Sequence, residues 1–229
     1  MKKITKQNNF VYLFFSLIIF LFSAAVTVDF PNSAGDDVFS IVTLLMLLLS
    51  LKSLQTERTW KRTVYGLIVF FVLLTALGKF FDHQLYVYLI LITLLVFFIG
   101  SFLSAAKQVL TVGDIDGNKI IGSLSLYLLL GLSWAMIYLL LLAMDPQSFS
   151  GVEVANWQQG FSRIAYYSFV TLTTLGYGDV LPTTHVSEFF VYMEAIVGVF
   201  YMAIIVSSLI SLRMAAIEHK TKDDEKKGE

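Results

Sequence analysis

The chain has 229 residues, of which 57% are hydrophobic and 14% are charged. A soluble globular domain carries about 25% charged residues, so an ordinary soluble enzyme and a disordered chain are both excluded. The formal net charge is −1 with no dense basic stripe, which argues against a nucleic-acid-binding protein. The absence of cysteine excludes disulfides, thiolate metal sites and cysteine nucleophiles. The composition predicts an integral membrane protein with almost no soluble part.

Six apolar runs follow one another along the chain, separated by short polar breaks. They cover residues 10–28, 38–51, 64–77, 85–106, 120–144 and 186–212. A helix needs about 20 apolar residues to span a bilayer, and the second and third runs are shorter than this. They can still cross if the basic and tryptophan side chains at their ends reach the interface. We therefore expect an all-α integral membrane protein with six transmembrane helices.

The first run has two interpretations. A basic segment, an apolar stretch and the small residues Ser23, Ala24 and Ala25 resemble a secretory signal peptide with its cleavage site. The apolar stretch is longer than the roughly 7–15 residues typical of signal peptides, which favours a retained helix.

Basic residues predict the orientation of these helices. If there are six crossings, nearly all Lys and Arg residues fall on one side, and only Lys79 and Arg163 fall on the other. Asp29, Asp36 and Asp37 cluster on that other side. We therefore expect a multi-pass protein of the cell membrane with cytoplasmic N- and C-termini.

The segment 148–181, between the last two runs, does not fit a crossing. A short apolar piece at 161–170 leads into Thr171-Leu172-Thr173-Thr174-Leu175-Gly176-Tyr177-Gly178-Asp179. A short helix followed by a glycine-bearing strand, between two long helices, predicts a re-entrant loop. Non-helical backbone at membrane depth is tolerated only if it is buried in protein or lines a wet cavity.

The spacing of the glycines in this segment has a physical meaning. A pore that strips water from K⁺ must replace the hydration shell with rings of oxygen atoms. Backbone carbonyls provide such rings if alternate residues adopt left-handed angles, which glycine does without steric cost. Gly176 and Gly178 have this spacing, and the hydroxyl of Thr174 can add an oxygen at the inner end. The side chains of Leu175 and Tyr177 then point away from the axis.

The same residues resemble the selectivity signature of potassium channels, T-x-x-T-x-G-Y-G-D. The matching residues are Thr171, Thr174, Gly176, Tyr177, Gly178 and Asp179, followed by Pro182. The resemblance implies a filter of Thr174, Leu175, Gly176, Tyr177 and Gly178, with K⁺ bound at the first four. Over 120–212 the chain is similar to the two-helix pore module of these channels, of the prokaryotic type. The first four helices resemble a peripheral domain only in number.

Flanking residues extend the resemblance. Tyr166 and Tyr167 stand where the family has pore-helix aromatics, which implies a cuff around Tyr177, and Thr173 and Asp179 are further candidates for supporting the filter. Gly198 lies twenty residues after Gly178, where many members have a hinge glycine, although close helix packing explains it equally.

Two positions depart from the family pattern. Leu175 replaces the usual valine or isoleucine, which raises the alternative of a weakly selective cation channel. Val170 stands where some members have a glutamate that bonds the filter aspartate. Arg163 is expected to point outward or to meet Glu153, and His185 is either a pH-sensitive group at the outer mouth or a solvated residue.

Gating candidates lie on the sixth run. Glu194 is an intramembrane carboxylate, either protonated or bonded to groups behind the filter. We weigh a role in gating or filter stability against a neutral acid that is merely paired with a Ser or Tyr. By the resemblance, Met202, Val206 and Ile210 face a central cavity and can gate by dewetting; otherwise they meet lipid or neighbouring helices.

The fourth run contains no Arg or Lys before Lys107 at its end. A voltage sensor needs several such charges, because one charge crossing 100 mV gains only about 2.3 kcal/mol. We therefore expect weak or no voltage dependence.

One re-entrant loop encloses a quarter of a pore, so closure implies a homotetramer. The expected parts are a peripheral domain without sensor charges at 1–112, a pore domain at 113–213 and a charged cytoplasmic tail at 214–229. Expected partners are three identical subunits and membrane lipids, with no nucleic acid and no cofactor beyond the transported K⁺. No catalytic motif is found, so we expect no enzyme; a non-conducting accessory subunit is the alternative from another class.

Overall fold

The structure, a computed structural model, describes residues 9–28, 33–54, 58–78, 84–110, 117–152 and 157–228. Within these ranges the chain forms seven α-helices and one pair of two-residue strands. The elements are α1 (Asn9–Thr27), α2 (Ser33–Ser53), α3 (Arg58–Gly78), α4 (Gln84–Val109), α5 (Gly117–Met144), β1 (Phe149–Ser150), α6 (Trp157–Leu172), β2 (Leu181–Pro182) and α7 (His185–Gly228).

Six of these helices, all but α6, are long and apolar enough to cross a membrane. The second and third apolar runs belong to helices of spanning length, because α2 and α3 each have 21 residues. Polar residues at the helix starts, such as Asp36 in α2 and Arg58 in α3, lengthen each helix beyond its apolar run. The prediction of six helices of spanning length is confirmed.

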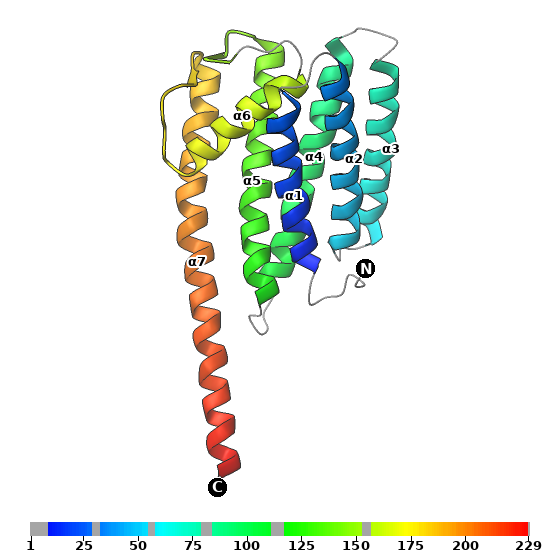
Figure 1. Cartoon of the computed structure of the whole chain (residues 1–229). Helices are drawn as coiled ribbons and strands as arrows, with labels where there is room; N and C mark the ends of the chain where they lie inside the picture. Colours follow the sequence, from blue (N-terminus) through cyan, green and yellow to red (C-terminus); the bar gives the residue numbers. More distant parts are fainter. Residues whose placement is uncertain are drawn as a thin grey trace.

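The long helices run side by side, and α1 begins at the same end of the bundle at which α5 begins and beyond which α7 extends (Figure 1). The last helix is one continuous helix to Gly228, so the charged tail expected at 214–229 continues α7 without a break. α6 is different, since it runs obliquely near the opposite end of the bundle and stops part-way along it.

The two short strands close the excursion that contains α6. Ser150 pairs with Leu181 and Phe149 with Pro182, in antiparallel register. The N–H of Thr183 also donates to the carbonyl of Ser148 at 3.0 Å. The chain therefore leaves the end of the bundle and returns to it at the same point. The segment between β1 and β2 enters the molecule and comes back out.

Aromatic packing anchors the first half of α6 to the peripheral helices. The ring of Phe161 lies 5.0 Å from that of Phe20 in α1 and 5.2 Å from that of Phe39 in α2. Trp157 contacts Phe39 as well, with ring centroids 5.9 Å apart, and Phe98 of α4 lies behind Phe20. The three phenylalanines 20, 39 and 161 are almost completely buried. Helix α6 thus packs directly on α1 and α2, and α4 supports this contact from behind Phe20.

A buried polar junction ties the other end of the bundle together. The side-chain oxygen of Asn118, in α5, accepts the backbone N–H of Phe10 at 3.1 Å. Its amide nitrogen donates to the side-chain oxygen of Asn9 at 2.7 Å, and Asn9 donates in turn to Gln108 of α4 at 3.3 Å. The hydroxyl of Ser53 donates to the Asn9 carbonyl, so the junction also includes the end of α2.

Replacing Asn118 with leucine should lower the free energy of unfolding by about 1–3 kcal/mol, because the N–H of Phe10 and the amide of Asn9 lose a buried partner. Thermal unfolding in detergent measures the effect. Thr63→Ala is the control, since the Thr63 hydroxyl bonds only its own helix on an exposed surface. A loss no larger than that of the control would contradict a structural role for the junction.

Candidate functional site

The glycine loop, which we define as residues 173–179, leads from the end of α6 towards β2 and is exposed throughout. Three alternate residues have left-handed backbone angles: φ is +60° at Thr174, +56° at Gly176 and +79° at Gly178. Left-handed residues at every second position turn successive carbonyl groups towards one side, whereas an ordinary strand alternates them. The loop backbone is thus able to present a row of carbonyl oxygens.

Short-range hydrogen bonds hold the inner end of the glycine loop. The N–H of Thr174 donates to the carbonyl of Thr171 at 2.9 Å, and those of Leu175 and Gly176 donate to the carbonyl of Val170 at 2.9 and 3.4 Å. A β-branched residue in the left-handed region costs about 1–2 kcal/mol. Such strain persists where the surroundings fix it, most often at functional sites. The sequence analysis did not predict this conformation at Thr174.

The contact between α6 and α7 gives the depth of the loop. A Cβ atom added to Gly198 would lie 2.3 Å from the carbonyl oxygen of Leu172, the last residue of α6. Gly198 is 13 residues after His185, which places it about 20 Å along α7 at 1.5 Å per residue. This level lies inside the candidate span His185–Ile205. The glycine loop therefore begins inside the span and leads back over about 20 Å to β2, which lies at the end of the bundle.

Of the two explanations left open for Gly198, close packing has direct support in the structure. The 2.3 Å distance is to a backbone oxygen, which cannot move aside as a side chain can. The added Cβ would also lie 3.1 Å from the side chain of Leu172. Only a residue without a Cβ allows α7 to lie this close to the end of α6.

Four side chains meet at the outer part of the loop. The Arg163 guanidinium lies 3.1 Å from Asp179 Oδ2, and its Nε donates to the carbonyl of Gly151 at 3.3 Å. It also lies over the ring of Tyr166, whose hydroxyl donates to Asp179. The ring of Tyr166 is parallel to that of Tyr177, with centroids 6.5 Å apart. We expected Arg163 to point outward or to meet Glu153, which lies outside the described residues; its side chain is partly exposed and pairs with Asp179.

The two tyrosines of the expected aromatic cuff have different surroundings. The ring of Tyr166 stacks on that of Tyr177. Tyr167 is buried and packs against Tyr138 of α5 and Phe149 of β1, each with a centroid distance of 5.5 Å. Within a single chain, Tyr167 therefore anchors α6 to α5.

Glu194 lies at the junction of three helices and is completely buried. The hydroxyl of Tyr138, from α5, donates to its Oε2. The hydroxyl oxygen of Ser168, from α6, lies 2.5 Å from Glu194 Oε1 and 2.8 Å from the carbonyl oxygen of Gly131. The site is compatible with both alternatives considered for Glu194. Its partners are one Ser and one Tyr, and Ser168 belongs to α6, the helix that leads into the glycine loop. The sequence analysis did not identify Tyr138 and Ser168 as partners, because they lie 56 and 26 residues from Glu194 along the chain.

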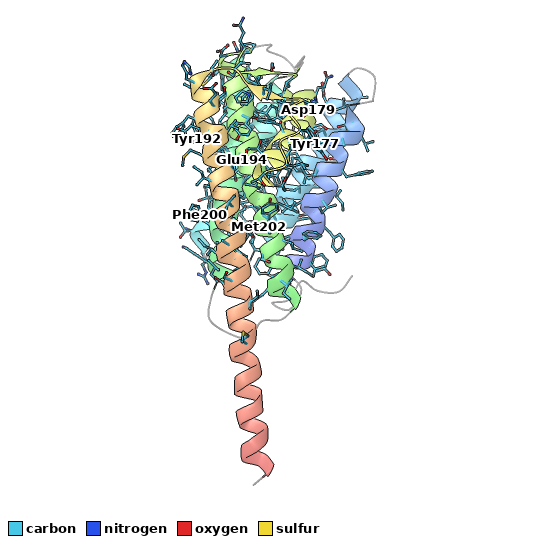
Figure 2. All side chains as sticks on the ribbon, turned by 90° about the vertical axis from the view of Figure 1, so that its left-hand side faces the viewer. Tyr177, Asp179, Tyr192, Glu194, Phe200 and Met202 are labelled. Atoms are coloured by element: carbon cyan, nitrogen blue, oxygen red, sulfur yellow. The ribbon has the colours of Figure 1, made fainter. Side chains whose placement is uncertain are left out.

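Two of the remaining candidates on α7, Met202 and Ile210, are exposed. Met202 and Ile210 are 51% and 56% exposed in the single chain, and the side chain of Val206 lies outside the described residues. Figure 2 labels Tyr192, Glu194, Phe200 and Met202 along α7. His185, also a candidate, is the exposed first residue of α7 and lies 3.3 Å from Glu188.

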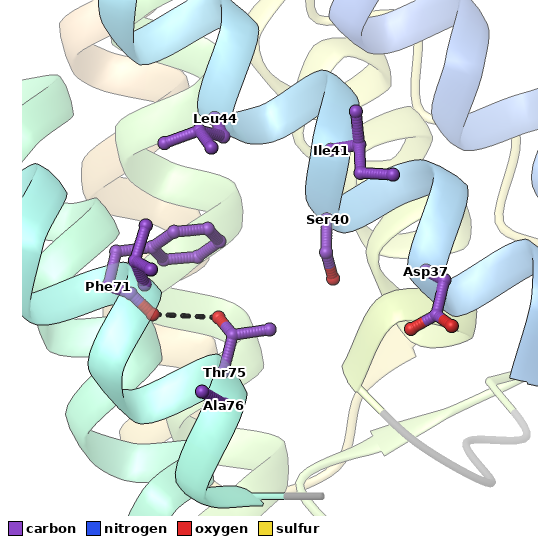
Figure 3. A pocket seen from close by; sticks show the side chains of 8 residues that line it. Asp37, Ser40, Ile41, Leu44, Phe71, Thr75 and Ala76 are labelled. Carbon is purple, nitrogen blue, oxygen red and sulfur yellow. Dashed lines mark hydrogen bonds between the residues drawn. The ribbon is translucent and has the colours of Figure 1, made fainter.

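A cavity of about 380 Å³ lies between α2 and α3, away from the glycine loop (Figure 3). Its wall is mostly apolar, with Asp37 at one end. The hydroxyl groups of Ser40 and Thr75 face it but donate to carbonyls of their own helices, at 2.8 and 2.7 Å. The cavity includes none of the predicted site residues.

The middle and end of the chain have a counterpart among known families. Residues 124–214 match the family model described as ion channel. The match begins inside α5 and covers α6, the glycine loop and α7 as far as Met214. Comparison with curated proteins and with solved structures gives no match. The ion channel domain and the six apolar helices support a multi-pass membrane channel rather than an enzyme.

Replacing Gly198 with alanine should force the end of α6 away from α7 and lower the free energy of unfolding by about 1–3 kcal/mol, the usual cost of overpacking. Thermal unfolding in detergent measures the change. Gly66→Ala is the matched control, since a Cβ at this helical glycine meets no atom within 4 Å. Its expected effect is neutral or stabilising by up to about 1 kcal/mol. Equal effects of the two substitutions would contradict the packing role.

Proposed function

We propose that the chain is one subunit of a homotetrameric potassium channel of the cell membrane, which conducts K⁺ passively. The observation that carries the proposal is the left-handed backbone at Thr174, Gly176 and Gly178, within a domain that matches ion channels. This conformation is the one that a filter of backbone carbonyls needs.

In this proposal the glycine loop is the selectivity filter and α6 is the pore helix. Carbonyl oxygens of residues 174–177, with the hydroxyl of Thr174, take the place of the water molecules around K⁺. Gly178 completes the turn at the outer end. Leu175 and Tyr177 point away from the ions, and Tyr166 supports Tyr177 from behind.

Closure of the filter supports the tetramer. Exposed non-helical backbone cannot face lipid at membrane depth, and one loop supplies only one wall of a pore. Three further copies would cover the loop and complete each ring of oxygens. The large exposed residues of the loop and of neighbouring α7, Leu175, Tyr177, Phe200 and Met202, then find partners in adjacent subunits or in lipid.

Electrostatics favour a cation along this path. The carboxyl end of α6 carries roughly half a negative charge, and it points from the bundle end towards the middle of the span. At the outer end, Asp179 would make the mouth negative, but its pair with Arg163 offsets part of this charge. Both side chains are more than one-third exposed, so this pair contributes little to stability.

The filter is tested by the reversal potential of the purified protein in planar bilayers, with K⁺ on one side and Na⁺ on the other. We expect reversal near the K⁺ equilibrium potential and block by Ba²⁺. A reversal near zero would indicate a weakly selective cation channel, with Leu175 the first residue to exchange for valine. Membranes that stay silent under every stimulus applied would favour a non-conducting accessory subunit.

Gly178→Ala provides a sharper test of the backbone conformation. Alanine at φ +79° costs about 1–2 kcal/mol, so selective current should be lost or strongly reduced. Gly66→Ala, in a helix far from the glycine loop, should conduct as the unmodified protein does. Unchanged selectivity in Gly178→Ala would contradict a carbonyl filter at this position.

The proposed channel is weakly voltage-dependent or voltage-independent. Lys52 and Lys107 lie in the last turns of α2 and α4, and the three basic residues of α3 all lie within its first five positions, near the ends of the spans, where they do not cross the field. The conductance in symmetric K⁺ should therefore change gradually with voltage. A steep conductance–voltage curve would contradict the assignment of α1–α4 as a domain without a sensor.

A further inference from the structure

Three hydrogen bonds connect the groups around Glu194, but the two hydroxyl groups among them have only two protons to donate. The links join Tyr138 to Glu194, Glu194 to Ser168 and Ser168 to the carbonyl of Gly131. Each link needs one proton. Tyr138 and Ser168 hold one each, and a backbone carbonyl only accepts.

The direction of each link follows from its ends. Ser168 must donate to Gly131, because that carbonyl has no proton to give, and this uses the only proton of Ser168. The 2.5 Å link between Ser168 and Glu194 then needs a proton from the carboxyl group. Tyr138 donates to the other carboxyl oxygen. All three links are satisfied if Glu194 is a neutral acid, and one fails if it is ionised.

The surroundings agree with this count. Glu194 is completely buried, and in the described part of the chain no Lys, Arg or His side chain lies within salt-bridge distance of it. The other titratable groups that face it are tyrosines, namely Tyr127 and Tyr138 of α5 and Tyr167 of α6. A buried carboxylate without a cation is strongly unfavourable, particularly within a membrane.

We propose that Glu194 is a neutral carboxylic acid whose proton links α7 to α6 and α5, and that it acts as a positioning residue for the selectivity filter. This inference rests on the proposed function. The link acts on α6 at Ser168, two residues before Val170, whose carbonyl receives the N–H groups of Leu175 and Gly176. Movement of α6 at this point reaches the inner end of the filter directly.

Infrared spectroscopy of the purified protein tests the proton itself. The carbonyl stretch of a protonated carboxylic acid lies apart from the bands of carboxylates and amides. We expect such a band at neutral pH in the unmodified protein and its loss in Glu194→Gln. In Ser168→Ala the band should shift to higher frequency, because the acid loses its acceptor. No difference between the unmodified protein and Glu194→Gln would overturn the inference.

Selectivity measurements test the positioning role. A glutamine side chain accepts from Tyr138 with its oxygen and donates to Ser168 with its nitrogen, which reproduces the neutral acid. Glu194→Gln should therefore keep the K⁺/Na⁺ permeability ratio. Glu194→Leu, of similar volume but without either bond, should lower it about tenfold, in line with the loss of buried hydrogen bonds. An unchanged ratio in Glu194→Leu, or an equal loss in both variants, would overturn the positioning role.

The two arms separate this inference from the proposed function. If the unmodified protein carries no selective current, the proposed function fails, and the infrared band still decides whether Glu194 holds a proton. If current is selective but the band is missing, the channel stands and the neutral acid is wrong.

Discussion

The constraint on which the structure depends is the cost of polar backbone within a membrane. The N–H groups of residues 173–176 donate to carbonyls of α6, but among the described residues no backbone N–H donates to a carbonyl of residues 173–179. The contact of Gly198 with Leu172 places the inner end of this loop about 20 Å along α7. Lipid offers nothing to satisfy such groups. Either protein or water must cover them, so the depth of the loop and its exposure in the single chain together favour an assembly around a wet path.

Much of the remaining structure keeps that loop in place. The paired strands fix the point where the chain enters and leaves, and the aromatic rings of Phe20, Phe39 and Phe161 hold the first half of α6. The second half is held by Glu194 and by the close approach at Gly198. The strained angle at Thr174 is therefore attached to a helix that is fixed at both ends, which is the condition for strain to persist.

The sequence predicts the features that depend on local pattern. Apolar length located the six long helices, although α2 and α3 begin before their apolar runs because polar residues can take helical conformation at an interface. The left-handed angles at Gly176 and Gly178 were foreseeable, since glycine adopts them without steric cost. The same angle at Thr174 was not, because threonine disfavours it and only the bonds of the folded chain impose it.

Long-range pairs were also beyond the sequence. The partners of Glu194 lie on two other helices, and the approach of Arg163 to Asp179 depends on how the loop folds back beside α6. Periodicity identifies which face of a helix is apolar, but it does not say which neighbour that face meets. A single intramembrane glutamate therefore indicated a polar partner without naming it.

The packing of α6 on α1 and α2 gives the peripheral helices a physical connection to the proposed filter that does not require a voltage sensor. Phe161 packs against rings of both α1 and α2, Trp157 packs against Phe39 of α2, and well-packed aromatic groups do not deform continuously. A displacement of α1 or α2 must either move α6 or open a void beside Phe39. Since the carbonyl of Val170 in α6 accepts the N–H groups of Leu175 and Gly176, the positions of the peripheral helices are mechanically linked to the geometry of the proposed filter within one chain.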